Sequence, residues 1–100
     1  MKQIILIAIA ALALAGCDYG QTRSSFQLKV AGKTVDEAID TAGKPARRES
    51  RSPEETVLVY ERKTFDAENM NAKDASVLVT FRKDPKSGKF EYRGIEFVPL

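Results

Sequence analysis

The sequence predicts a small α+β domain over residues 26–100, in which one short helix packs on a three-stranded antiparallel meander sheet. The helix is expected at residues 35–42, where apolar residues recur at helical spacing between clear start and stop signals. The strands are expected at residues 56–65, 76–83 and 90–98, which are rich in β-branched and aromatic residues. Short connections between consecutive strands favour the meander order.

The first 16 residues have a composition of their own. Lys2 gives a positively charged start, and residues 4–15 then run without a charged or hydrogen-bonding side chain. This pattern is typical of a secretory signal peptide. The apolar run is also shorter than the ~20 residues that a membrane-spanning helix needs. We therefore expect residues 1–16 to be a signal peptide that is removed.

The segment Leu14-Ala15-Gly16-Cys17 resembles the lipobox of bacterial lipoproteins. The resemblance implies cleavage between Gly16 and Cys17, attachment of a diacylglycerol to the Cys17 thiol, and acylation of the new amino group. Two or three acyl chains hold a protein stably on a bilayer, whereas one binds reversibly. Cys17 is the only cysteine, so the chain cannot form an intramolecular disulfide. The alternative is an ordinary secretory signal followed by a free thiol.

Residues 17–25 are interpreted as the lipidated cysteine and a flexible tether, because residues 18–25 are polar and lack periodicity. Asp18, directly after the cysteine, resembles the sorting signal that retains enteric lipoproteins at the inner membrane. In residues 26–30, apolar side chains alternate with polar ones, which predicts a short strand or an extended lead-in.

Local signals define the helix at residues 35–42. Thr34 and Glu37 have the spacing of a capping box, in which each side chain binds the backbone N–H of the other residue. Gly43 suits a left-handed helix end, and Pro45 prevents the helix from continuing. Residues 52–55 could add a second helical turn, although the strand-like residues after them oppose it.

The last two strands are expected to form a hairpin, because residues 84–88 have proline early and glycine late. Phe90 and Tyr92 are out of phase with the later apolar residues of the same run. A bulge at Gly94 would restore the phase by adding one residue to that strand. The link over residues 65–75 is expected to be a longer polar loop.

The order of these elements resembles the small outer-membrane assembly lipoproteins of the SmpA/OmlA (BamE-like) family. The resemblance rests on Gly32-Lys33-Thr34 with Val35 and Glu37, on Ala42-Gly43-Lys44-Pro45, and on a strand beginning at Val57 with Tyr60. The family usually has leucine where Ala42 stands, and a clearer second helix. The resemblance implies a non-enzymatic scaffold that binds partner proteins or lipid. Shape alone does not decide this, because hydrolase inhibitors share it.

Composition argues against several classes of function. The chain has no histidine, and lipidation would consume Cys17, which removes the common nucleophile–base pairs and most transition-metal sites. We therefore expect neither an enzyme nor a bound metal or cofactor. The formal net charge of +2 gives no overall field for nucleic acid. The carboxylates Asp36 and Asp40 are interpreted as solubilising charges on the helix surface.

The candidate contact residues for a partner or for lipid are a basic cluster and one tyrosine: Lys44, Arg47, Arg48, Arg51 and Tyr60. Cations near anionic headgroups favour surface binding, although a solvated loop would have the same sequence. Because one helix covers only one face of a sheet, residues such as Leu58, Tyr60 and Leu78 are expected to lie partly uncovered on the other.

The sequence thus predicts a lipid-anchored, periplasm-facing protein-interaction module, such as an envelope or outer-membrane assembly accessory factor. The alternative is an inhibitor or exclusion lipoprotein that blocks an incoming hydrolase, phage or conjugation apparatus. The choice of membrane stays open, because Asp18 indicates the inner membrane and the family resemblance indicates the outer one.

Overall fold

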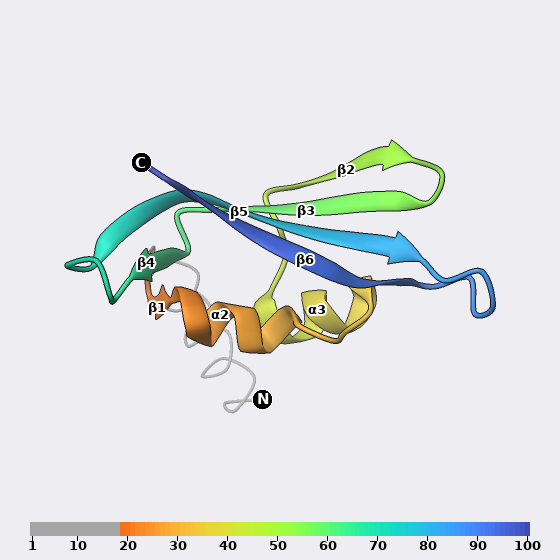
Figure 1. The fold of residues 1–100 in the computed structure, drawn as a ribbon, viewed down its shortest axis with the longest axis horizontal. Coiled ribbons are helices and arrows are strands. Elements are labelled where there is room, and N and C mark those ends of the chain that lie inside the picture. Colours follow the sequence, from red (N-terminus) through yellow and green to blue (C-terminus); the bar gives the residue numbers. More distant parts are fainter. Residues whose placement is uncertain (1–18) are drawn as a thin grey trace, which may run out of the picture.

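The structure, a computed structural model, describes residues 19–100. In this part, two helices lie together beside a mixed six-stranded sheet (Figure 1). The elements in chain order are β1 (Gln21–Thr22), α2 (Arg23–Val30), α3 (Val35–Ala42), β2 (Arg47–Ser52), β3 (Glu55–Glu61), β4 (Thr64–Asp66), β5 (Ala72–Lys83) and β6 (Phe90–Pro99). The predicted fold of one helix on a three-stranded meander is therefore wrong. The predicted signal peptide, Cys17 and Asp18 lie outside the described residues.

The long strand β5 organises the sheet. It pairs antiparallel with β3 along one edge and with β6 along the other, so the pairings expected among the three predicted strands are present. The sheet is larger than predicted because β2 adds to the free edge of β3. At the start of β5 the short strand β4 pairs antiparallel, and β1 pairs with β4 in parallel, which makes the sheet mixed.

The segment before α3 is a helix and not the predicted strand or lead-in. Thr22 caps α2 by accepting a hydrogen bond from the backbone N–H of Ser25 at 3.0 Å. Phe26 and Val30 are four residues apart, so both face the core, whereas Leu28 is 78% exposed. The alternation itself is typical of a strand, but Phe26 and Val30 at i and i+4 also fit one helix face, on which Leu28 does not lie. The flexible tether predicted to reach residue 25 is correspondingly wrong for residues 21–25, which belong to β1 and α2.

The helix α3 is confirmed with the predicted bounds and capping box, whereas Gly43 ends it with a positive φ but not in the predicted left-handed helical conformation. The Thr34 hydroxyl accepts a hydrogen bond from the Glu37 N–H at 3.3 Å, and the Glu37 carboxylate accepts one from the Thr34 N–H at 2.9 Å. Gly43 ends the helix with φ +94° and ψ 177°, a conformation that side chains strongly disfavour. The helix is thus defined by local chemistry that the sequence displays.

Three other predictions for the sheet need correction. The run 56–65 is not one strand, because Arg62, with φ +52°, separates β3 from β4. Residues 65–75 do not form a long loop, since β4 and β5 extend into them and form a hairpin. The polar residues after α3 form strand β2, and residues 52–55 contribute the connection to β3, not a second helical turn.

The predicted bulge in the last strand is present, shifted by one residue. Thr80 pairs with Gly94 and Phe81 pairs with Tyr92, so the extra residue is Arg93. Gly94 does not have a positive φ, and a Cβ placed there would meet open space. The local geometry of the bulge therefore does not require a glycine at position 94.

The core lies between the helices and the facing side of the sheet. Phe26 meets Tyr60 edge-on, with 5.0 Å between ring centroids, and both side chains are fully buried. The Tyr60 hydroxyl donates to the Gly43 carbonyl at 2.7 Å, and burial raises the pKa of this phenol to about 12. Leu58 and Tyr60 thus pack against the helices, which contradicts the prediction that they lie partly uncovered. The buried members of the cluster are Phe26, Val30, Val35, Ala38, Leu58, Tyr60, Val77, Val79 and Phe81.

Candidate functional site

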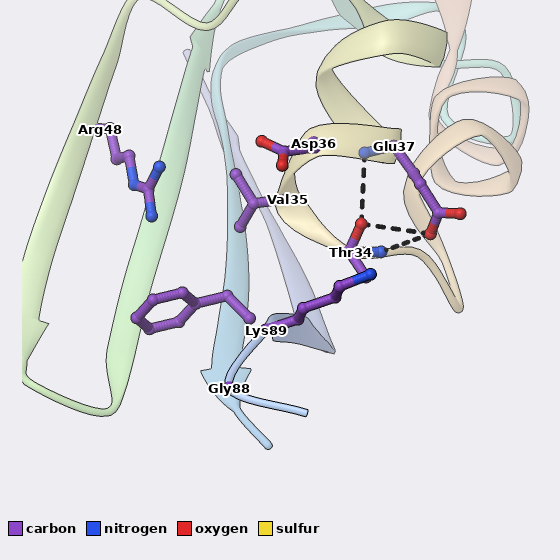
Figure 2. Close-up of a pocket in the computed structure, with 8 residues that line it drawn as sticks. Thr34, Val35, Asp36, Glu37, Arg48, Gly88 and Lys89 are labelled. Carbon is purple, nitrogen blue, oxygen red and sulfur yellow. Dashed lines mark hydrogen bonds between the residues drawn. The ribbon is translucent and has the colours of Figure 1, made fainter. Parts of the chain in front are cut away.

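A hollow among the described residues lies where α3 begins. It has a volume of ≈ 450 Å³ and opens widely to solvent. Three segments distant in sequence form it, namely the start of α3, strand β2, and the turn that leads into β6. Figure 2 shows Arg48 reaching it from β2, opposite Val35 and Asp36 on α3. The lining residues are Thr34, Val35, Asp36, Glu37, Arg48, Gly88, Lys89 and Phe90.

The start of α3 brings negative charge to this hollow. Glu37 is committed to the capping box, and the hydrogen bond from the Thr34 backbone holds the pKa of its carboxyl below the usual value. Asp36 lies in the same first turn. Two carboxylates at the helix start offset the positive end of the helix dipole. The N-terminus of α3 is therefore unsuited to bind a free anion in the hollow.

Arg48 supplies the opposite charge and is held in place by two contacts. Its Nε donates to the Thr56 hydroxyl at 3.1 Å, and its guanidinium carbon lies 5.6 Å from the centroid of the Phe90 ring. Within residues 19–100, its two terminal nitrogens make no hydrogen bond to another group. A guanidinium that is oriented in this way presents its remaining donors at little entropic cost.

The hollow thus combines an ordered cation from β2 with carboxylates from α3, and the side chain of Lys89 adds a second cation that reaches toward Thr34 at the start of the helix (Figure 2). Val35 and Phe90 supply apolar surface. This mixture suits an extended polypeptide segment, because peptides carry both charge signs, backbone polar groups and apolar side chains. The specificity of such peptide binding depends more on complementary charges than on the depth of the hollow.

The predicted basic cluster is not one surface. Successive side chains of a strand point to opposite faces, so Arg48 turns toward the helix side while Arg47 turns away from it. Arg47 pairs with Glu49 at 2.7 Å and with Glu61 at 2.9 Å, which neutralises its charge. The same contact lowers the pKa of the Glu49 carboxyl.

The other predicted contact residues are divided between surface and core. Lys44 and Arg51 are exposed and line none of the hollows described here. Tyr60 is fully buried, so it offers no surface to a partner. Of the five predicted contact residues, the structure places only Arg48 in the hollow. Sequence reasoning missed the role of Asp36, Lys89 and Phe90, because nothing local shows that they converge.

A second polar cluster lies at the junction of α2 with the sheet. Arg23 donates to both carboxylate oxygens of Asp74, at 2.9 and 2.5 Å, and Thr64 donates to one of them at 2.8 Å. The Arg23 hydrogen bond is the main cause of the low pKa of the Asp74 carboxyl, and the Thr64 hydrogen bond adds to it. Arg23 also lies 5.1 Å from the centroid of the Phe97 ring. Because Asp74 is only 1% exposed and fully engaged, this cluster fastens α2 to the sheet.

Comparison of the chain with known protein families, with curated protein sequences and with solved structures gave no match. Neither of the two described helices has the length and apolar character needed to cross a membrane.

Proposed function

We propose that the chain is a lipid-anchored, periplasm-facing adaptor that binds a partner protein of the cell envelope. The lipobox Leu14–Cys17 supports the anchor and the export. The observation that carries the binding role is the hollow in which an ordered Arg48 faces the Asp36 end of α3. An accessory factor of outer-membrane assembly, as the resemblance to the SmpA/OmlA family suggests, is the form of adaptor that we favour.

The arrangement of the elements suits this role. In Figure 1, β1 and the turn between β4 and β5 lie toward one end of the molecule, and the turns after β2 and β5 lie toward the other. The hollow belongs to the second end, because Gly88 and Lys89 lie in the turn after β5. A chain anchored ahead of β1 would therefore present the hollow away from its attachment point.

Site-directed photocrosslinking in cells tests the binding role. A benzophenone amino acid would replace Lys89, which lines the hollow, or Lys86, which lies in the same turn but does not line it. We expect a discrete adduct from position 89 and none from position 86. The additional change Arg48→Ala should abolish the adduct, while Arg51→Ala, on the same strand, should leave it.

Adducts from both positions, or an adduct that persists without Arg48, would contradict the proposed site. The identity of the partner then separates the two functional classes. Crosslinking to a resident envelope protein would support the adaptor role. Crosslinking to an incoming hydrolase, phage or conjugation protein would instead show that the chain blocks that protein. Density-gradient separation of the membranes would assign the anchor to the inner or the outer membrane.

A further inference from the structure

The end of the molecule where the described chain begins has an unusual surface. Tyr19 is fixed there by a hydrogen bond from its backbone N–H to the Arg62 carbonyl at 2.8 Å. Its ring lies 5.1 Å from the Nζ atom of Lys73. A shallow notch of ≈ 210 Å³ is lined by Tyr19, Phe65, Asn71 and Lys73. The surface therefore combines two half-buried aromatic rings with an exposed cation.

Strand pairing separates this surface from the polar cluster of Arg23. Phe65 pairs directly with Lys73 across β4 and β5, whereas the neighbouring Thr64 donates to the buried Asp74. Asp66 is occupied in the same cluster, where its carboxylate lies 3.4 Å from Arg23. The acidic groups of β4 and β5 are thus neutralised beside α2, and Lys73 stays exposed beside Tyr19.

Exposed apolar side chains extend this surface. Among residues 19–100 the strongly exposed large apolar residues are Leu28, Met70 and Leu100. Met70, at 96% exposure, lies in the turn between β4 and β5, next to the notch residue Asn71. Leu100 lies close by, because its backbone N–H donates to the Lys73 carbonyl at 3.3 Å. Two of the three exposed apolar side chains therefore belong to the same end.

Chain length connects this surface to the anchor. Tyr19 is two residues after Cys17, and two residues span at most ~7 Å. Tyrosine rings and lysines are enriched at the level of lipid headgroups, where an apolar body meets a charged or polar tip. We infer that the surface formed by Tyr19, Phe65, Met70 and Lys73 rests on the phospholipid bilayer that carries the anchor, with Met70 inserted among the headgroups. This inference depends on the proposed lipid attachment.

Such contact fixes the orientation of the domain. A long flexible tether would let the domain rotate freely, whereas two residues and an apolar contact surface hold one end against the bilayer. The hollow at the start of α3 then faces the periplasm, where a partner can reach it.

Tryptophan fluorescence tests the orientation, because the chain has no tryptophan of its own. The full-length lipidated protein would carry Met70→Trp, or Lys86→Trp in the turn at the opposite end as the matched control. Each variant would be reconstituted in vesicles of phosphatidylethanolamine and phosphatidylglycerol with brominated acyl chains. We expect a blue shift and loss of most of the fluorescence for Met70→Trp, and neither for Lys86→Trp. The additional change Lys73→Glu should weaken the quenching.

The outcomes separate the two proposals. Variants that fail to float with the vesicles would refute the lipid anchor and, with it, this orientation. Variants that float, but show equal quenching at both positions or stronger quenching at position 86, would refute the orientation alone.

Discussion

The contact between Arg23 and Asp74 joins residues 51 positions apart and links α2 to the sheet through two hydrogen bonds. Changing Asp74→Asn would remove the main anionic partner of Arg23 and leave only Asp66, whose carboxylate lies 3.4 Å from the guanidinium. We expect the free energy of unfolding to fall by about 2 to 4 kcal/mol, below the full value for a buried pair because Arg23 is partly exposed. Urea denaturation measures this change.

The exposed Asp40→Asn serves as the control and should change stability by less than about 0.5 kcal/mol. Equal effects of the two substitutions would contradict the structural role of the cluster.

The same carboxylate makes stability depend on pH. Its pKa in the folded state lies below that of the unfolded chain, which is about 3.9 for aspartate. The stabilisation is therefore complete above that unfolded value and is lost as pH falls through the folded pKa. The stability difference between wild type and Asp74→Asn should be constant near neutral pH and shrink in acid. A difference that grows with acidity would show that the carboxyl is not stabilised as an anion.

At the scale of single elements, a helix or strand could be predicted from the sequence when the residues that determine it lie close together in the chain. Helix α3 was predictable because its cap, apolar spacing and glycine end all lie within ten consecutive residues. Strand β2 was missed because all six residues of Arg47–Ser52 are polar, and it pairs through its backbone with the apolar strand β3. Charged residues are common on edge strands, where they discourage aggregation. Edge position is a property of the assembled sheet, which local sequence does not reveal.

The end of α3 gives a test at the same scale. Gly43 has a backbone conformation that is essentially restricted to glycine, and its carbonyl accepts the Tyr60 hydrogen bond. Gly43→Ala should destabilise the fold by about 1 to 3 kcal/mol. Gly94→Ala, at a site without a positive φ and with open space for a methyl group, should change stability by less than about 0.5 kcal/mol. Thermal unfolding followed by circular dichroism compares them, and a more harmful Gly94→Ala would contradict this account.

At the scale of the whole molecule, sequence predicted the pairings of the long strands but not what surrounds them. The alternation of Phe26, Leu28 and Val30 favours a strand, and only burial shows that Phe26 and Val30 face the core from a helix while Leu28 points to solvent. The candidate site was recovered only in Arg48, because the hollow depends on residues 36, 48 and 89 meeting in space. Tyr60, a predicted contact residue, belongs to the core because two helices, not one, cover its side of the sheet.

The two ends of the molecule have different roles in this account. The end at β1 carries Tyr19 and Met70 and is proposed to rest on the bilayer, and the end at the start of α3 carries the hollow. Both proposals depend on a lipid group at the residue that lies two positions before Tyr19. Without that group, neither the membrane attachment nor the orientation has a physical basis.

Intact mass spectrometry of the mature protein, extracted from bacterial membranes, tests that claim most directly. The account predicts a chain that begins at Cys17, with the added mass of a diacylglycerol and an N-linked acyl group, and Cys17→Ala should eliminate both the processing and the lipid. A chain with an unmodified thiol at position 17, whether the leader is retained or cut elsewhere, would contradict it.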